Sequence, residues 1–242
     1  MAIGFSTGSL AGHDVLRGVQ MTLQTDSTAI ELSALREAEL EPLLALLDEL
    51  DLSRFTWISL HAPSKLQYLS EAAVVSLLQP VAERGWSIIA DPDVITDVAA
   101  WQTLGDRLCL ENMDKRKGTG RTVGELAECF RQVPDAGFCF DIGHARQVDP
   151  TMLEARRMLR TYSNRLRQVH MSYVNSASRH EPLNFEAMTA FSRVMSAIPE
   201  ETPIILETPV TEHAMQRQIN LAKSLVSTQC PPRATLNTAE TC

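Results

Sequence analysis

Short apolar runs recur along the chain, and each is followed by a segment in which apolar residues return with helical spacing. The runs are rich in β-branched or aromatic residues, and we predict a strand for each: residues 3–7, 29–33, 55–61, 86–91, 107–112, 137–142, 166–172 and 203–208. Helices are predicted after them, for example over residues 36–50, 70–84 and 211–226. Strict alternation of strands and helices indicates a parallel sheet covered by helices, either closed as a barrel or open and doubly wound.

Polar residues decide between these two architectures. Acids and histidines stand at or near the C-terminal ends of most runs: Glu31, His61, Asp91, Glu111, Asp141, His170 and Glu207. Neighbouring strands lie about 4.8 Å apart, so the second and eighth strands of a flat sheet could not share one small site. Closing the sheet brings these strand ends together, at the rim where barrel enzymes gather their catalytic groups. We therefore predict a single-domain (β/α)8 TIM barrel over residues 1–228.

Local signals mark some helix starts, whereas the C-terminal stretch has none. Thr122 and Glu125 form a capping-box pattern, and Asp149 precedes Pro150 as a capping acid does at the start of a helix. Residues 229–242 combine prolines with polar residues and show no periodicity. We predict a flexible C-terminal tail there.

Length and composition fit this architecture. The chain has 242 residues, 44% of them hydrophobic and 21% charged, and a barrel of this kind takes about 250 residues. It contains no apolar run of about eighteen residues and no signal-peptide pattern, so we expect a cytoplasmic protein without membrane association. Its 5 cysteines are an odd number, and we expect reduced, structural thiols.

The charge balance favours a small metabolite over nucleic acid as the partner. A net charge of -8 and a pI near 5.3 oppose binding to a polyanion, which normally requires a broad basic face. The glycines in residues 4–12 lack the spacing of a dinucleotide-binding loop, so we expect no nicotinamide cofactor. The sequence leaves the oligomeric state open and is compatible with a homo-oligomer.

The last four predicted strands each end in a residue that binds divalent metals: Glu111, Asp141, His170 and Glu207. Three carboxylates facing one another would raise one another's pKa, whereas a bound divalent ion keeps all three ionised. Oxygen-rich ligation favours Mn2+ or Mg2+, with Zn2+ or Co2+ as alternatives. Any one of these residues could instead be neutralised by a Lys, an Arg or a backbone group, but four in succession favour a metal site.

Several segments resemble the xylose isomerase-like barrel superfamily: IELSAL, ISLHAP, LENM, FDIGHA, QVHMS, RHEPL and ILET. This superfamily includes sugar and sugar-phosphate isomerases and epimerases, and also endonuclease IV. In its epimerases the Glu, Asp, His and Glu of the last four strands bind one metal, which implies that role for the four residues above. The resemblance also implies that three histidines contribute to the site and contact substrate: His61, His144 and His180.

Two departures from the endonuclease IV pattern favour a single metal. Such proteins hold three metals and use a histidine where this chain has Asp91, and an Asp-x-His motif where it has Ser178-Arg179-His180. Asp91 is a candidate for an additional ligand in place of that histidine. Ser178 is a poor substitute for a carboxylate.

A basic loop, DKRKGTGRT over residues 114–122, follows the fifth predicted strand. It belongs to the active face of a barrel, and its glycines, basic side chains and following helix could bind a phosphate or carboxylate. The alternative is a solvated, flexible loop. Lys117 and Arg121 are the predicted anion contacts, with Arg179 as a third. An acidic substrate therefore ranks slightly above a neutral sugar.

These features predict a metal-dependent isomerase or epimerase of a small sugar, sugar phosphate or sugar acid. Such enzymes abstract a proton next to a carbonyl through a metal-stabilised enediolate, with Glu111 and Glu207 as general base and acid. A hydride shift is an alternative route. Competing hypotheses are a metal-dependent hydrolase or lyase, including an endonuclease IV-like phosphodiesterase, and a binding protein on a catalytically inactive barrel. The sequence does not specify the substrate or its stereochemistry.

Overall fold

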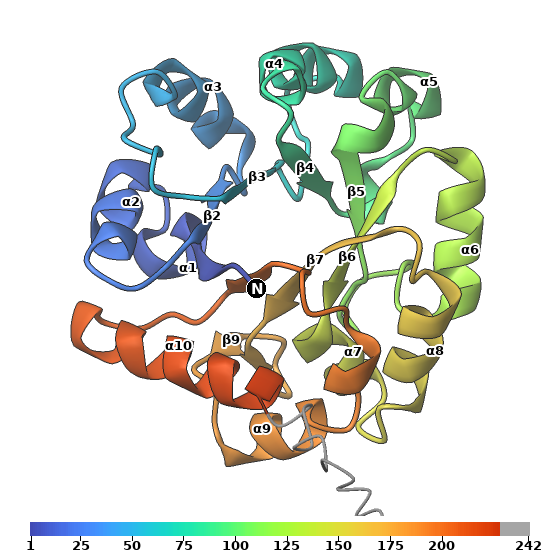
Figure 1. The fold of residues 1–242 in the computed structure, drawn as a ribbon. Coiled ribbons are helices and arrows are strands. Elements are labelled where there is room, and N and C mark those ends of the chain that lie inside the picture. The colour runs from blue at the N-terminus through green and yellow to red at the C-terminus, as the bar shows by residue number, and fades with distance from the viewer. Residues whose placement is uncertain (228–242) are drawn as a thin grey trace, which may run out of the picture.

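Parallel strands close into a barrel in the computed structural model, which describes residues 1–227 (Figure 1). The strands follow one another around the barrel in chain order, and the last pairs with the first: β1 (Ile3–Ser6), β2 (Ala29–Ser33), β3 (Trp57–His61), β4 (Ser87–Ala90), β5 (Leu108–Glu111), β6 (Gly137–Asp141), β7 (Leu166–Met171) and β10 (Ile204–Leu206). Each strand lies inside the run predicted for it. The single-domain (β/α)8 TIM barrel is therefore confirmed. The predicted tail, residues 229–242, lies outside the described residues.

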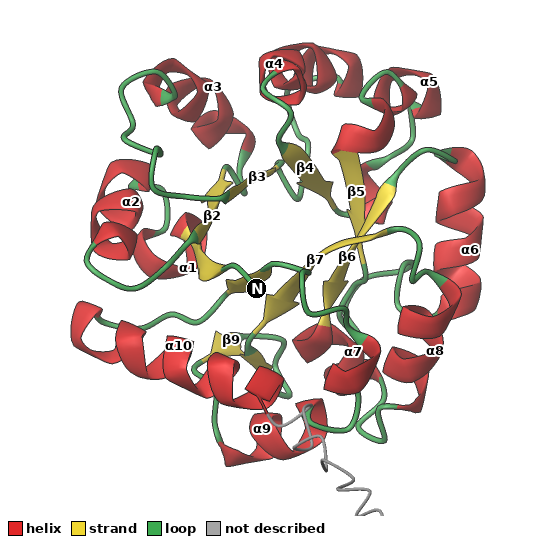
Figure 2. Cartoon of the chain, in the orientation of Figure 1, coloured by secondary structure: helices red, strands yellow, loops and turns green. Residues whose placement is uncertain are grey.

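Helices form the outer layer around the strands (Figure 2). They are α1 (Thr7–Ala11), α2 (Val15–Leu23), α3 (Glu37–Leu46), α4 (Glu71–Glu83), α5 (Val98–Gln102), α6 (Val123–Gln132), α7 (Ile142–Val148), α8 (Leu153–Thr161), α9 (Phe185–Phe191) and α10 (Glu212–Ser227). Three short 3-10 turns join them: Pro92–Val94, Gly105–Arg107 and Met195–Ala197. Within residues 1–227, no helix combines the length and apolar character that crossing a membrane requires.

An antiparallel hairpin that the sequence analysis did not predict follows β7. It consists of β8 (Tyr173–Val174) and β9 (His180–Glu181). The side chain of Gln147 holds its turn, because the Nε2 atom donates to the carbonyl oxygen of Asn175 at 2.7 Å and to Ser178 Oγ at 2.6 Å. This hairpin carries His180 to the rim of the barrel.

The strands are buried on both faces, as expected for a parallel sheet covered by helices. Every residue of β2 and β6 is buried. Because side chains alternate along a strand, Phe138 and Phe140 of β6 pack in the main core under the helices, whereas Cys139 points into the barrel with Ile89 and Cys109. Cys109, Cys129 and Cys139, the three cysteines of the described part of the chain, are free.

The two helix starts singled out in the sequence have different outcomes. At α6, the Thr122 hydroxyl accepts a hydrogen bond from the Glu125 backbone N–H at 3.2 Å, as predicted. The helix start after Asp149 was predicted wrongly, because α8 begins only at Leu153, after Met152 in a left-handed conformation (φ 64°). Asp149 instead closes a turn over Thr151, although its carboxylate still accepts the Glu154 backbone N–H at 2.9 Å.

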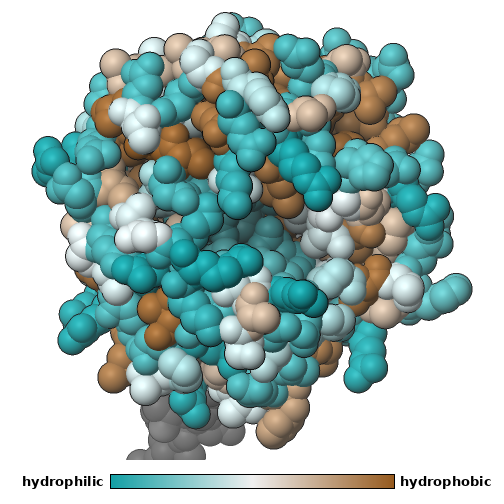
Figure 3. Space-filling model, turned by 180° about the vertical axis from the view of Figure 1, so that it is seen from behind, coloured by the Kyte–Doolittle hydropathy of each residue, from teal (hydrophilic) through white to brown (hydrophobic). Residues whose placement is uncertain are grey.

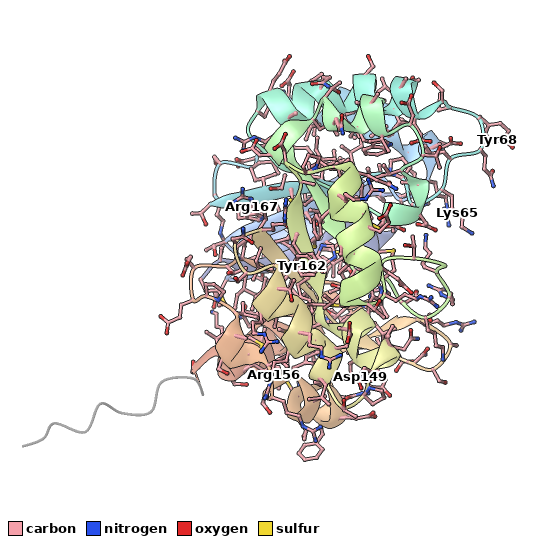
Figure 4. All side chains as sticks on the ribbon, turned by 90° about the vertical axis from the view of Figure 1, so that its right-hand side faces the viewer. Lys65, Tyr68, Asp149, Arg156, Tyr162 and Arg167 are labelled. Carbon is pink, nitrogen blue, oxygen red and sulfur yellow. The ribbon has the colours of Figure 1, made fainter. Side chains whose placement is uncertain are left out.

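The C-terminal ends of the strands open onto one face of the barrel. The N-terminus lies at the front of Figure 1, and the opposite face, seen in Figure 3, is hollowed at its centre and lined by hydrophilic residues. In the side view of Figure 4, Lys65 and Tyr68, which follow β3, extend at one end of the barrel, and Arg167 at the start of β7 lies toward the other. The strand-end residues therefore gather beneath the hydrophilic hollow.

Candidate metal centre

The structure brings the four predicted metal ligands together at the rim. Glu111 ends β5, Asp141 ends β6, His170 lies near the end of β7 and Glu207 follows β10, and these strands are neighbours in the barrel. One ligand atom from each residue lies within 4.8 Å of the others. His170 Nδ1 is 3.3 Å from Glu111 Oε1 and 3.6 Å from Glu207 Oε2. We call these four residues the central group.

Two buried atoms of the central group lack hydrogen-bond partners in the described part of the chain. They are Asp141 Oδ2 and His170 Nδ1. Leaving a buried polar atom unsatisfied costs about 1–3 kcal/mol, so such atoms normally have a function or a missing partner. A divalent cation would satisfy both, and a set of three carboxylates and one imidazole suits Mn2+, Mg2+, Zn2+ or Co2+. The residues present therefore fit the metal that the resemblance implies.

Glu31, on the opposite side of the barrel interior, orients His170 by contacting the ring nitrogen that faces away from the central group. His170 Nε2 lies 2.9 Å from Glu31 Oε2, so an Nε2–H donates to this carboxylate and Nδ1 faces the central group. Burial lowers the pKa of His170, but the neighbouring acidic groups outweigh it and hold it well above its usual value, so an arriving ion would displace the Nδ1 proton. Glu31 also accepts hydrogen bonds from Gln168 Nε2 at 2.7 Å and Ser59 Oγ at 3.1 Å. A carboxylate behind a ligating histidine is a common device for orienting the ring.

Neither Glu31 nor Gln168 belongs to the predicted site. Glu31 is recognisable as an acid near a strand end, but its contact with His170 spans 139 positions of the chain. Gln168 stands two positions before His170, so both side chains point into the barrel. The amide of Gln168 is itself oriented by the Trp57 indole N–H, which donates to its Oε1 at 2.9 Å.

The local structure at the end of β6 explains the spacing of Asp141 and His144. Asp141 caps α7, since its Oδ1 accepts the His144 backbone N–H at 2.6 Å, and this leaves Oδ2 directed toward the site. The Asn112 side chain exchanges two hydrogen bonds of 2.8 Å with the Asp141 backbone. Gly143 lets this turn pack against Ser172, which lies between β7 and β8, because a Cβ there would lie 2.5 Å from the Ser172 carbonyl oxygen.

Burial and mutual repulsion change the pKa values of the carboxyl groups in the central group. Burial raises the pKa of Glu207 to about 8, and the negative charges of Glu111 and Asp141 add to this effect. Burial likewise raises the pKa of Asp141 to about 6. Burial also opposes ionisation of Glu111, but the surrounding histidines outweigh it and hold the pKa of Glu111 well below its usual value.

The three histidines implied by the resemblance surround the central group. His61 Nε2 lies 3.1 Å from Glu111 Oε2, and its Nδ1–H donates to the Ala62 carbonyl oxygen at 2.8 Å. His144 Nδ1 lies 3.2 Å from Glu111 Oε1. His180 Nδ1 lies 2.8 Å from Ser172 Oγ and 3.4 Å from Glu207 Oε2.

The same histidines differ in their charge state. Burial lowers the pKa of His61 and of His144, but the neighbouring acids outweigh it and raise both to about 10. Burial, together with the nearby His144, lowers the pKa of His180 to about 3. When no metal is bound, a neutral His180 therefore lies beside the positively charged imidazole of His144, with the ring centroids 5.2 Å apart.

Two further groups of metal-binding side chains adjoin the central group. One consists of His61, Asp91 and Glu111, and we call it the outer group. The other consists of Asp141, His144 and His180. Each shares one carboxylate with the central group. Ser178, which replaces the carboxylate of the Asp-x-His motif, belongs to neither group and accepts a hydrogen bond from Gln147.

The cations predicted to bind an anion pair with acids of this chain, with one exception. Lys117 Nζ lies 2.9 Å from Asp91 Oδ2 and 2.9 Å from both oxygens of Asp93. Arg121 pairs with Glu125 at 2.7 Å. Arg179 is exposed and forms no ion pair with any described residue. The charge of the basic loop is thus largely balanced within the protein.

Comparisons with known proteins agree with this architecture. Residues 93–225 match the family model described as xylose isomerase-like TIM barrel. Endonuclease IV from Thermus thermophilus superposes with a TM-score of 0.63 at 19% identity, over 94% of this chain and 100% of that one. L-ribulose 3-epimerase superposes with a TM-score of 0.64 at 12% identity, over 95% and 96%.

A third similar structure contains a metal. It is a xylose isomerase-like TIM barrel protein from Mycobacterium smegmatis in complex with magnesium, with a TM-score of 0.55 at 12% identity over 88% of this chain and 89% of that one. No curated protein matches the sequence. Because the similar structures include an epimerase and an endonuclease, the shared fold leaves the reaction open. Since the family model matches more than half of its length, the chain belongs to the xylose isomerase-like TIM barrel family.

Proposed function

We propose that this protein is a divalent-metal-dependent isomerase or epimerase of a small sugar, sugar phosphate or sugar acid. The observation that carries the proposal is the central group: three carboxylates and one imidazole, with one ligand atom of each within 4.8 Å of the others. Among the described residues, its buried atoms Asp141 Oδ2 and His170 Nδ1 have no hydrogen-bond partner. A divalent ion held there would polarise the oxygens of a substrate and stabilise the negative charge of an enediolate. The hydrophilic hollow above the group suits a small polar molecule (Figure 3).

Glu111 and Glu207 are the proposed base and acid. In the metal-free chain their pKa values are shifted in opposite directions, since the histidine neighbours hold the pKa of Glu111 well below its usual value, whereas burial raises that of Glu207 to about 8. Two carboxyl groups that differ in this way suit complementary roles in proton transfer. Glu111 would accept the proton from the carbon next to the carbonyl, and Glu207 would donate one.

The paired cations change the ranking of substrates. The basic loop favoured an acidic substrate in the sequence, but Lys117 and Arg121 are neutralised by acids of the same face, and Arg116 pairs with Asp114 at 2.6 Å. A neutral sugar is therefore as suitable a substrate as a sugar phosphate or sugar acid. Arg179 remains the proposed anion contact.

The deciding experiment measures proton exchange. Mn2+-loaded protein is incubated in D2O with ketoses, sugar phosphates and sugar acids, and we expect solvent deuterium to enter one of them. Glu207→Gln should lower this exchange by about 100-fold or more, because general acid–base catalysis typically contributes that much. Glu212→Gln is the matched control, since Glu212 is exposed at the start of α10 and pairs only with Arg17 among the described residues. Full exchange in Glu207→Gln would contradict the assignment.

A metal-dependent hydrolase or lyase, including an endonuclease IV-like phosphodiesterase, is the second candidate. The observation in its favour is that the two additional groups supply three metal-binding side chains each beside the central group. The net charge of -8 opposes a nucleic-acid substrate. Two or three bound ions per chain together with phosphodiester cleavage would replace our proposal with this one.

A further inference from the structure

Lys117 places a positive charge against the outer group. Its ammonium contacts Asp91 Oδ2 and both oxygens of Asp93 at 2.9 Å, and only 20% of its side chain is exposed. The Asp91 side chain is 7% exposed. This buried ion pair lies at the edge of the proposed metal centre and has no part in the proposed chemistry.

The outer group has the composition of a second metal site. His61 Nε2 lies 3.1 Å from Glu111 Oε2 and 3.8 Å from Asp91 Oδ1, and the three ligand atoms lie within 4.8 Å of one another. Two carboxylates and an imidazole form a competent donor set for a divalent ion. Glu111 belongs to both groups, so an ion in each would share this carboxylate.

The two oxygens of Asp91 face different partners. Oδ1 faces His61, whereas Oδ2 is bonded to Lys117. An ion bound at Oδ1 would lie on the same carboxylate as the ammonium, a few ångströms from it. Like charges at that separation repel strongly when they are buried, and the lysine already neutralises the acid that the ion would need.

The loop that carries Lys117 is fixed in place. Arg116 pairs with Asp114 at 2.6 Å, the Lys117 backbone N–H donates to the Asp114 carbonyl oxygen at 3.2 Å, and the Met113 N–H donates to the Gly120 carbonyl oxygen at 2.9 Å. A fixed loop reduces the entropy cost of holding a long side chain in one place. The ammonium is thus positioned before any ion arrives.

We propose that Lys117 is the resident cation of the outer group and that it limits the centre to one divalent ion. The inference rests on the proposed metal-dependent function, because it concerns how many ions the same centre holds. Lys117 is in this view a positioning residue: it neutralises Asp91 and keeps Glu111 available to the central group.

The test counts bound ions. Lys117→Met keeps an apolar side chain of similar length and removes the charge. Lys115→Met is the matched control, because Lys115 lies in the same loop, is exposed and forms no ion pair with any described residue. Mn2+ is added by equilibrium dialysis, the ions per folded chain are measured by metal analysis, and electron paramagnetic resonance reports whether two Mn2+ ions are close enough to couple.

We expect one ion in the wild type and in Lys115→Met, and two coupled ions in Lys117→Met. The second ion should bind at least tenfold more tightly in Lys117→Met than in the wild type. It should be lost again in the double variant Lys117→Met/His61→Ala, which removes a donor of the outer group.

Two results would overturn the inference and still leave the proposed function standing. One such result is a single bound ion in folded Lys117→Met. The other is two bound ions in a wild type that still catalyses the proposed proton exchange. The wild-type count is informative even if Lys117→Met does not fold, and Lys117→Gln then serves as the second variant. A wild type that binds no Mn2+ would instead contradict the proposed function itself.

Discussion

Glu31 selects which nitrogen of His170 faces the central group. Its Oε2 accepts the His170 Nε2–H at 2.9 Å inside a fully buried network, so Nδ1 is the nitrogen that an ion can bind once its proton is displaced. Because Glu31 belongs to no metal-binding group of the described residues, its effect on an ion passes through the imidazole. The carboxylate behind the ring also increases the basicity of Nδ1.

We therefore expect Glu31→Gln to weaken Mn2+ binding by about 10-fold to 100-fold, the range found when a hydrogen-bond partner of a ligating histidine is removed. The measurement is competition with a fluorescent chelator at fixed pH. Glu125→Gln, which alters an ion pair with Arg121 at the start of α6, is the control and should bind Mn2+ as the wild type does. Unchanged Mn2+ affinity in Glu31→Gln would show that metal binding by His170 does not depend on the Glu31 carboxylate.

At the residue scale, the sequence predicted the candidate metal ligands better than it predicted the ion-pair partners of the loop cations. Glu111, Asp141, His170 and Glu207 could be identified because each is a polar residue at the end of an apolar run, and closing the barrel brings such ends together. The partners of the loop cations could not, since pairs such as Lys117 with Asp93 depend on how two loops fold toward each other.

Among the elements, the strands were predictable and the short irregular pieces were not. A strand buried on both faces is a continuous apolar run, so every strand of the barrel lies within its predicted range. The hairpin of β8 and β9 has strands of only two residues and leaves no periodic pattern. The start of α8 was misplaced because the Asp149-Pro150 signal forms a turn, followed by Met152 with positive φ.

The first turn of α7 has little space, and this leads to a prediction for Gly143. A Cβ at this position would lie 2.5 Å from the Ser172 carbonyl oxygen and 2.8 Å from Val174 Cγ2. Gly143→Ala should lower the free energy of unfolding by about 1–3 kcal/mol, as overpacking commonly does. It should also weaken Mn2+ binding, since Asp141 is the cap of the same helix.

Gly124→Ala is the control for that experiment. Gly124 lies in α6, and a Cβ there would meet no described atom within 4 Å. This substitution should stabilise the protein by up to about 1 kcal/mol, because alanine is the better helix former. Urea denaturation measures both variants. Equal stability of Gly143→Ala and the wild type would mean that α7 can shift without cost.

The whole molecule balances its buried charges differently with and without a metal. The groups with a raised pKa include Glu207, at about 8, Asp141, at about 6, His61 and His144, at about 10, and His170, well above its usual value. In each case the folded chain holds a proton that the unfolded chain releases at lower pH. Stability from such groups is present at low pH and is lost as the pH rises through the folded pKa.

The metal-free protein should therefore lose stability between about pH 6 and about pH 9. Glu207 contributes to the loss up to about pH 8, and the histidines, which the unfolded chain deprotonates near pH 6.5, contribute across the whole range, so Glu207→Gln should show a shallower decline below about pH 8. Mn2+ should reverse the trend, because an ion displaces these protons and binds more tightly as the pH rises. At a free concentration about 100 times its dissociation constant, it would add about 2.7 kcal/mol. Urea denaturation with and without a chelator measures both effects, and metal-free stability that rises over the same pH range would refute this description of the buried acids.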